Sequence, residues 1–142
     1  MLTPLELSAW RGLLQAHARI TRALDTELRA EHGLPVSSYE VLMFLADAPG
    51  HRLRMAEIAD MVLLSRSGLT RLVDRLEAAG LVTRCAAEDD GRGAYAELTA
   101  DGLAKLRAAR QTHLDGVRRH FLSALTADEQ AELAGIWARL VS

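Results

Sequence analysis

The chain has 142 residues, of which 49% are hydrophobic and 25% are charged, and its formal net charge is −2. This composition is typical of a globular protein. Because the net charge is slightly negative, a surface that binds nucleic acid would have to come from a local cluster of cationic residues. We expect a cytoplasmic protein that contacts no membrane, because the sequence shows no long apolar run and no N-terminal signal pattern, and its single cysteine cannot form an internal disulfide.

Two helices are predicted in the first third of the chain. Residues 3–6 form a capping box with proline at the first helical position, and Gly33 and Pro35 end this first helix near Glu31. A second capping box at residues 37–40, with Ser37 as the cap, predicts the next helix, which Ala48-Pro49-Gly50 ends. The first helix carries apolar residues at helical spacing: Trp10, Leu13, Leu14, Ile20, Leu24 and Leu28.

The centre of the chain predicts two more helices and a hairpin. A short helix runs from Met55 to about Val62, and a longer one follows Ser65 and stops at Gly80. The segments "LVTRCA" (81–86) and "AYAEL" (94–98) have strand-like content and are separated by the turn-rich "AEDDGRG". The last third predicts a long helix capped by Thr99 and a terminal helix that begins at a capping box, residues 126–129.

The helix that follows Ser65 has two distinct faces. Its apolar residues fall at i, i+3, i+4 and i+7 and predict one buried stripe: Leu69, Leu72, Val73 and Leu76. On the other side, the candidates for contact with base edges in a major groove are Arg66, Ser67, Thr70 and Arg71. Ser65 is mainly an N-cap, and Arg75 is a candidate for a phosphate or an intramolecular contact. The alternative is an ordinary solvated helix face, and the short helix before it and the hairpin after it favour DNA binding.

The hairpin loop carries one arginine between two glycines. Arg92 at such a tip is a candidate for the minor groove, where narrow A·T-rich DNA concentrates negative potential. The neighbouring acid Asp90 is a candidate support for the wing. The alternative is a polar turn without a binding role.

These segments carry a family resemblance. "MAEIADMVLLSRSGLTRLVDRLEAAGLVTR" followed by "EDDGRGAYAELTADG" resembles the DNA-binding core of the MarR family of bacterial transcriptional regulators. Residues 70–77 match its recognition helix, Asp90-Gly91-Arg92 matches its wing motif, and Leu98-Thr99 with Gly102 matches the entry to its fifth helix. Gly91 stands where a second arginine is common, which implies one positive charge fewer on each wing.

The resemblance implies a mainly α fold with a small β-hairpin wing, in which a winged helix-turn-helix lobe (36–98) lies between dimerisation helices (1–35 and 99–142). It implies a homodimeric repressor that binds a pseudo-palindrome in double-stranded DNA and is released by a small-molecule effector. The alternative is a DNA-binding activator or an architectural protein without an effector. The apolar terminal helices favour a dimer independently, since a small lobe cannot bury them. No motif of a hydrolase, phosphate loop or metalloprotease occurs, so we expect neither enzymatic activity nor a cofactor.

The resemblance also implies where a small aromatic or phenolic effector binds, although each residue there has an alternative role in packing. The matching positions are Trp10, His17, Tyr39, Met43, Arg110 and His113. We expect no metal site, because His113 and His120 are two turns apart and no closely spaced Cys or His ligands accompany them. Cys85 is either a redox sensor or, if Arg84 faces solvent, a small buried apolar residue.

Overall fold

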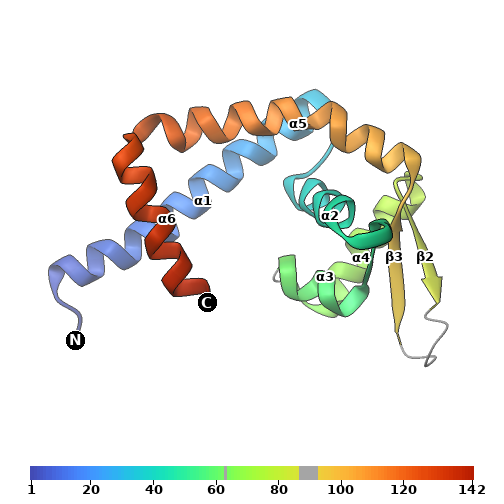
Figure 1. The fold of residues 1–142 in the computed structure, drawn as a ribbon, viewed down its shortest axis with the longest axis horizontal. Helices are drawn as coiled ribbons and strands as arrows, with labels where there is room; N and C mark the ends of the chain where they lie inside the picture. Colours follow the sequence, from blue (N-terminus) through green and yellow to red (C-terminus); the bar gives the residue numbers. More distant parts are fainter. Residues whose placement is uncertain (63, 87–92) are drawn as a thin grey trace.

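The computed structural model describes residues 1–62, 64–86 and 93–142. Long helices α1 and α5 lie side by side, with α6 at one end and the lobe that contains α2, α3, α4 and the strands at the other (Figure 1). The predicted fold class, mainly α with a β-hairpin wing, is therefore confirmed. No helix within the described ranges is both long and apolar enough to cross a bilayer. The elements are α1 (Pro4–His32), α2 (Val36–Asp47), η1 (Pro49–His51), β1 (Arg52–Arg54), α3 (Met55–Val62), α4 (Arg66–Ala78), β2 (Val82–Ala86), β3 (Ala94–Leu98), α5 (Ala100–His120), η2 (Leu122–Ala124) and α6 (Ala127–Val141).

Most helix ends follow from local capping chemistry. Thr3 and Thr126 form the predicted capping boxes, and Gly33 ends α1 in the left-handed conformation with φ of 62°. The predicted cap at Ser37 is wrong, because α2 begins at Val36 and forms no side-chain cap hydrogen bond within the described chain. The Val36 N–H instead donates to Asp25 Oδ1 of α1 at 2.9 Å. A contact from another helix therefore replaces the local cap.

The Asp25 carboxylate also pairs with Arg29 at 2.7 Å. Burial raises the pKa of Asp25, but the hydrogen bonds from Val36 and Arg29 lower it by more, so its pKa lies below its ordinary value. The ionised carboxylate therefore stabilises the junction of α1 and α2.

Asp25→Ala is expected to lower the free energy of unfolding at neutral pH by about 1–3 kcal/mol, because it leaves the Val36 N–H unpaired. Since the pKa is lower in the folded than in the unfolded state, this stabilisation is present above the unfolded value and is lost as the pH falls through the folded one. Urea unfolding of both proteins at neutral and acid pH measures the effect. Asp25→Asn, which keeps an acceptor oxygen, is the control and is expected to lose less. If the free energy of unfolding fell equally with pH in the wild type and in Asp25→Ala, this stabilising role of the Asp25 carboxylate would be excluded.

The sheet has the strand order β1-β3-β2, and both pairs are antiparallel. The β2–β3 hairpin was predicted, whereas β1 was not. This three-residue strand, Arg-Leu-Arg, shows no alternation long enough to read, and it forms only because β3 lies beside it. Leu53 and Arg84 both pair with Ala96, whose side chain is fully buried.

The core lies inside the lobe and continues into α1 and α5. The predicted stripe of α4, Leu69, Leu72, Val73 and Leu76, is buried as expected. It packs with residues of several other elements, of which the largest fully buried are Leu28, Leu42, Leu45, Ile58 and Leu106. Because Leu28 and Leu106 belong to this cluster, the lobe is fixed to the long helices by apolar packing. The division of the chain after residues 35 and 98 stays a prediction.

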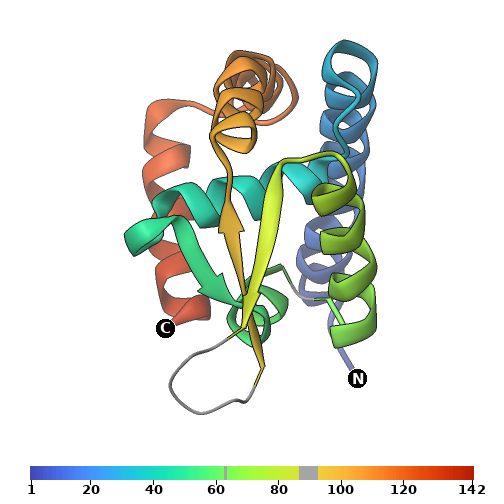
Figure 2. The same ribbon diagram turned by 90° about the vertical axis from the view of Figure 1, so that its right-hand side faces the viewer.

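The apolar stripe of α1 is only partly used within one chain. Leu24 and Leu28 are buried, whereas Trp10, Leu13 and Leu14 are 53%, 41% and 50% exposed. Every residue of α6 is at least partly exposed, and α6 and α1 stand on opposite sides of the molecule in Figure 2. The ends of the chain thus present apolar surface that a single copy does not cover.

Candidate nucleic-acid interface

The N-terminal end of α4 is fixed by its cap. Ser65 has extended φ and ψ angles, and its Oγ accepts a hydrogen bond from Gly68 N at 3.1 Å, so the predicted cap is confirmed. The same oxygen lies 3.2 Å from Ser67 Oγ. The Ser65 hydroxyl is therefore occupied by the helix itself.

The four predicted base-contacting residues share one exposed face. Arg66, Ser67, Thr70 and Arg71 are all exposed on the first turns of α4, and the first turn contains no acidic residue. The Thr70 hydroxyl donates to Arg66 O at 2.8 Å, which leaves its oxygen free to accept. The positive end of the helix dipole adds to the charge of the arginines. This end of α4 suits a polyanion that offers donors and acceptors.

Arg84 of β2 fastens the hairpin to α4, a role that sequence reasoning missed. The Nη2 of its guanidinium donates to Thr70 O at 3.0 Å and also to the Asp74 carboxylate. The backbone N–H of Arg84 donates to Glu77 Oε2 at 3.0 Å. Asp74 and Glu77 thus hold the hairpin, because the fold brings β2 beside α4.

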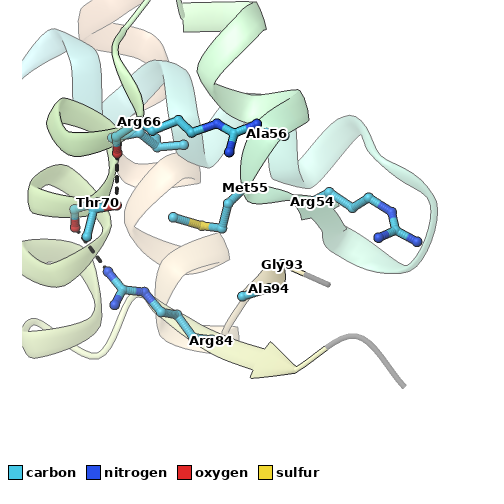
Figure 3. Close-up of a pocket in the computed structure, with 9 residues that line it drawn as sticks. Arg54, Met55, Ala56, Arg66, Thr70, Arg84, Gly93 and Ala94 are labelled. Carbon is cyan, nitrogen blue, oxygen red and sulfur yellow. Dashed lines mark hydrogen bonds between the residues drawn. The ribbon is translucent and has the colours of Figure 1, made fainter. Parts of the chain in front are cut away.

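A cavity of about 450 Å³ separates the hairpin from the start of α4 (Figure 3). Arg54, Arg66 and Arg84 line it together with apolar side chains such as Met55. In Figure 3 the Arg84 side chain points toward Thr70, and Arg66 extends toward α3 near Ala56. The contacts of Arg84 therefore lie at the edge of this cavity. Other residues of the hairpin pack in the buried core with α3 and α4: Val82, Ala96 and Leu98.

Two further arginines lie on the outer face of the sheet, and both belong to β1, the strand that was not predicted. The guanidinium carbons of Arg52 and Arg54 lie 4.2 and 4.9 Å from the centre of the Tyr95 ring. On the same face, Cys85 is half-buried and its thiol donates to Glu97 Oε2 at 3.5 Å. Arg84 faces α4 rather than solvent, so the condition under which Cys85 would be fully buried is not met.

Comparison with known proteins decides the family. The model of the MarR family matches residues 32–93. The HTH-type transcriptional regulator PapX of Escherichia coli is 30% identical over 123 residues, which cover 82% of this chain and 73% of PapX. The chain belongs to the MarR family of transcriptional regulators. The MarR family regulator AbsC of Streptomyces coelicolor is 35% identical with a TM-score of 0.89, covering 99% of this chain and 94% of AbsC.

A second MarR family regulator from Streptomyces coelicolor, solved in complex with DNA, is 36% identical with a TM-score of 0.90, over 99% of this chain and 91% of that one. The family and these relatives are transcriptional regulators rather than enzymes, as expected from the sequence. The matched residues 32–93 contain α2, α3, α4 and the strands β1 and β2, and they end one residue before β3.

Asp90, the predicted support of the wing, and Arg92, the predicted minor-groove contact, lie outside the described residues, so both roles stay predictions. Arg75 is exposed on α4 and forms no ion pair with any residue that the structure describes. Its role as a phosphate contact also stays a prediction.

The structure brings part of the predicted effector pocket together. The rings of Tyr39 and His113 stack at 4.3 Å with an interplanar angle of 26°. Burial raises the pKa of Tyr39, which the Arg110 guanidinium opposes, and burial lowers the pKa of His113. His113 Nδ1 is buried and accepts or donates no hydrogen bond within the described residues. A neutral imidazole with one unused nitrogen therefore lies beside a phenol and a cation.

The other three predicted pocket residues lie at different depths. Met43 packs against the core. His17 lies near Glu40: burial raises the pKa of the Glu40 carboxyl, and His17 partly opposes this rise. Trp10 is 53% exposed in the first half of α1. His120, which was considered as a metal ligand, contacts Glu27 instead, and the described residues contain no cluster of three metal-binding side chains.

Proposed function

We propose that this protein is a homodimeric repressor that binds a pseudo-palindromic operator in double-stranded DNA. The observation that carries the proposal is the start of α4, where Arg66, Ser67, Thr70 and Arg71 are exposed beside a helix N-terminus without acids. In this arrangement α4 enters the major groove and the wing reaches the adjacent minor groove.

Relatives support this proposal. Besides the Streptomyces coelicolor complex, a mutant MarR from Escherichia coli solved with operator DNA is 25% identical with a TM-score of 0.80. The HTH-type transcriptional repressor YetL of Bacillus subtilis is 33% identical over 88 residues, and it favours repression over activation for this chain.

The exposed apolar surfaces of α1 and α6 support the dimer. Leu13, Leu14 and Trp137 are 41%, 50% and 37% exposed in one chain, and a second copy would cover them. Two lobes in such a dimer read two half-sites about one helical turn of DNA apart, which is why the operator is expected to be pseudo-palindromic.

We place a small aromatic acid as the effector beside Tyr39, Arg110 and His113. The stacked rings offer an apolar contact, and Arg110 offers a charge for the carboxylate. Such an effector releases DNA only if it binds the DNA-free arrangement of the dimer more tightly than the bound one. Repeating the operator-binding assay with benzoic and phenolic acids tests this release.

Arg71→Ala and Arg92→Ala are expected to weaken operator binding in different ways. Loss of a bidentate contact to guanine at Arg71 costs about 1–3 kcal/mol on the operator and much less on unrelated duplexes. Loss of Arg92 weakens binding to all duplexes and lowers the slope of log affinity against log salt by about 1. Selection from random duplexes identifies the operator, and fluorescence anisotropy at several salt concentrations measures both effects.

Arg107→Ala is the matched control, since Arg107 is an exposed arginine on α5, outside the proposed interface. It is expected to leave affinity and salt slope unchanged. Wild-type affinity and slope in both interface variants would refute the proposed docking.

A further inference from the structure

A second groove lies at the end of α4 that is remote from its proposed DNA-contacting turn. In Figure 2 the paired ends of β2 and β3 that are remote from α5 lie low in the view, and α4 rises from below toward the start of α2. The groove has a volume of about 620 Å³ and is walled by the last turn of α1, the α1–α2 junction, the C-terminal end of α4 and the first turns of α5. It is therefore shared by the reading helix and the long helices that carry the lobe.

The lining of this groove is cationic. Arg29, Arg75 and Lys105 line it, and no carboxylate is among its lining residues. Arg29 is neutralised by Asp25 at 2.7 Å, whereas Arg75 and Lys105 form no ion pair in the part of the chain that the structure describes. Two uncompensated positive charges thus converge on one groove of a protein whose net charge is −2.

A buried hydroxyl also lines this groove. Ser38 is 3% exposed, and its side chain forms no hydrogen bond to any residue in the ranges 1–62, 64–86 and 93–142. The Ser38 oxygen is not among the fully buried unpartnered polar atoms of the described residues, so it is accessible from the groove and can donate a hydrogen bond to a bound ligand.

The start of α2 adds donors at the same place. Ser38 is the third residue of α2, whose own first turn has no acid and whose N-cap residue makes no side-chain cap, while the Asp25 carboxylate of α1 binds only the Val36 N–H. The first hydrogen bond of the helix is made by Tyr39 N to Pro35 O at 3.0 Å. The N–H groups of Ser37 and Ser38 therefore precede the helical ladder, and the positive end of the dipole faces the cations.

We propose that this groove binds a small organic dianion. Arg75 and Lys105 pair with its negative charges, and the Ser38 hydroxyl donates a hydrogen bond to one of its oxygens. Apolar contacts to its carbon skeleton come from Leu34, Leu76 and Leu81, which also line the groove. The volume is within the range of small-molecule sites, roughly 300–1,000 Å³. A phosphate monoester and a dicarboxylate share this chemistry.

This site is separate from the proposed effector pocket and does not depend on operator binding. Its occupant would be held by α4 through Arg75 and by α5 through Lys105. The position also gives Arg75 a role other than contact with the DNA backbone.

Calorimetric titration of the full chain without DNA tests the proposal. Propyl phosphate and succinate are the two dianion probes, and 1-propanol is the uncharged control. We expect saturable binding of at least one dianion at one site per chain, and none of 1-propanol. The tighter of the two dianions identifies the phosphate ester or the dicarboxylate as the class of ligand.

Two substitutions shift the expected affinity in opposite directions. Lys105→Gln removes one of the two free charges and is expected to weaken binding about tenfold. Asp25→Asn keeps the acceptor for Val36 but frees Arg29 and is expected to tighten it. Arg107→Gln, outside the groove on the same helix as Lys105, is the control and is expected to leave binding unchanged.

Failure of both dianions to bind the wild type would overturn the proposal. An equal loss in Lys105→Gln and Arg107→Gln would also overturn it, because the attraction would then be a general property of the charged surface. Since no DNA is present, neither result bears on the operator-binding proposal.

Discussion

Gly102→Ala is expected to destabilise the fold by about 3 kcal/mol or more, because no space for a side chain exists at this position. A Cβ at residue 102 would lie 2.1 Å from Leu81 O and 2.7 Å from Leu98 Cδ1. The Leu81 carbonyl is backbone and accepts a hydrogen bond from Thr99 N at 3.1 Å, so it cannot move without opening the junction of the hairpin with α5. Urea unfolding followed by circular dichroism measures the loss.

Gly135→Ala is the matched control for this substitution. Gly135 is also helical, and nothing lies within 4 Å of the position that its Cβ would take. The better helix propensity of alanine is expected to raise stability there by up to about 1 kcal/mol. An unfolding midpoint of Gly102→Ala equal to that of the wild type would show that the close approach of Leu81 does not constrain the fold.

Trp137→Glu is expected to convert the proposed dimer to monomers. An aromatic residue at the centre of an interface commonly contributes 2 kcal/mol or more, and a buried unpaired carboxylate adds a further penalty, so dimer dissociation should rise by about 100-fold or more. Trp137 belongs to the apolar face of α6, a helix on which every residue is at least partly exposed in one chain. Sedimentation equilibrium measures the association, and operator affinity is expected to fall with it because a monomer reads one half-site.

Gln130→Glu is the control, since it adds the same charge at an exposed polar position of α6. It is expected to keep both the association and the affinity for DNA. A Trp137→Glu protein that sediments as the wild type does would place the dimer interface elsewhere.

The capping and patterning of the sequence predicted most of the architecture. Thr3, Ser65 and Thr126 cap their helices as expected, because each hydroxyl meets an N–H only three residues away. The buried stripe of α4 and the β2–β3 hairpin were likewise predicted from local spacing and turn residues. These features depend on neighbours in the chain, which is why the sequence alone identifies them.

The errors and omissions concern contacts between distant segments. The cap at Ser37 was expected from a local pattern, but the carboxylate of Asp25, eleven residues earlier, binds the Val36 N–H instead. Strand β1 was missed because it exists only in partnership with β3. The role of Arg84 was missed because Thr70 and Asp74 become its neighbours only after the hairpin folds against α4.

Motifs in the sequence indicated the family by resemblance, and periodicity and capping, which act over a few residues, predicted the helices, the hairpin and the exposed face of α4. Only the tertiary structure decided which charges remain unpaired. Asp74 forms an ion pair with Arg84, and Asp25 forms one with Arg29. Arg75 and Lys105 instead line one groove that has no acid in its lining. Pairing of charges depends on distances between helices, and packing of the apolar core sets those distances.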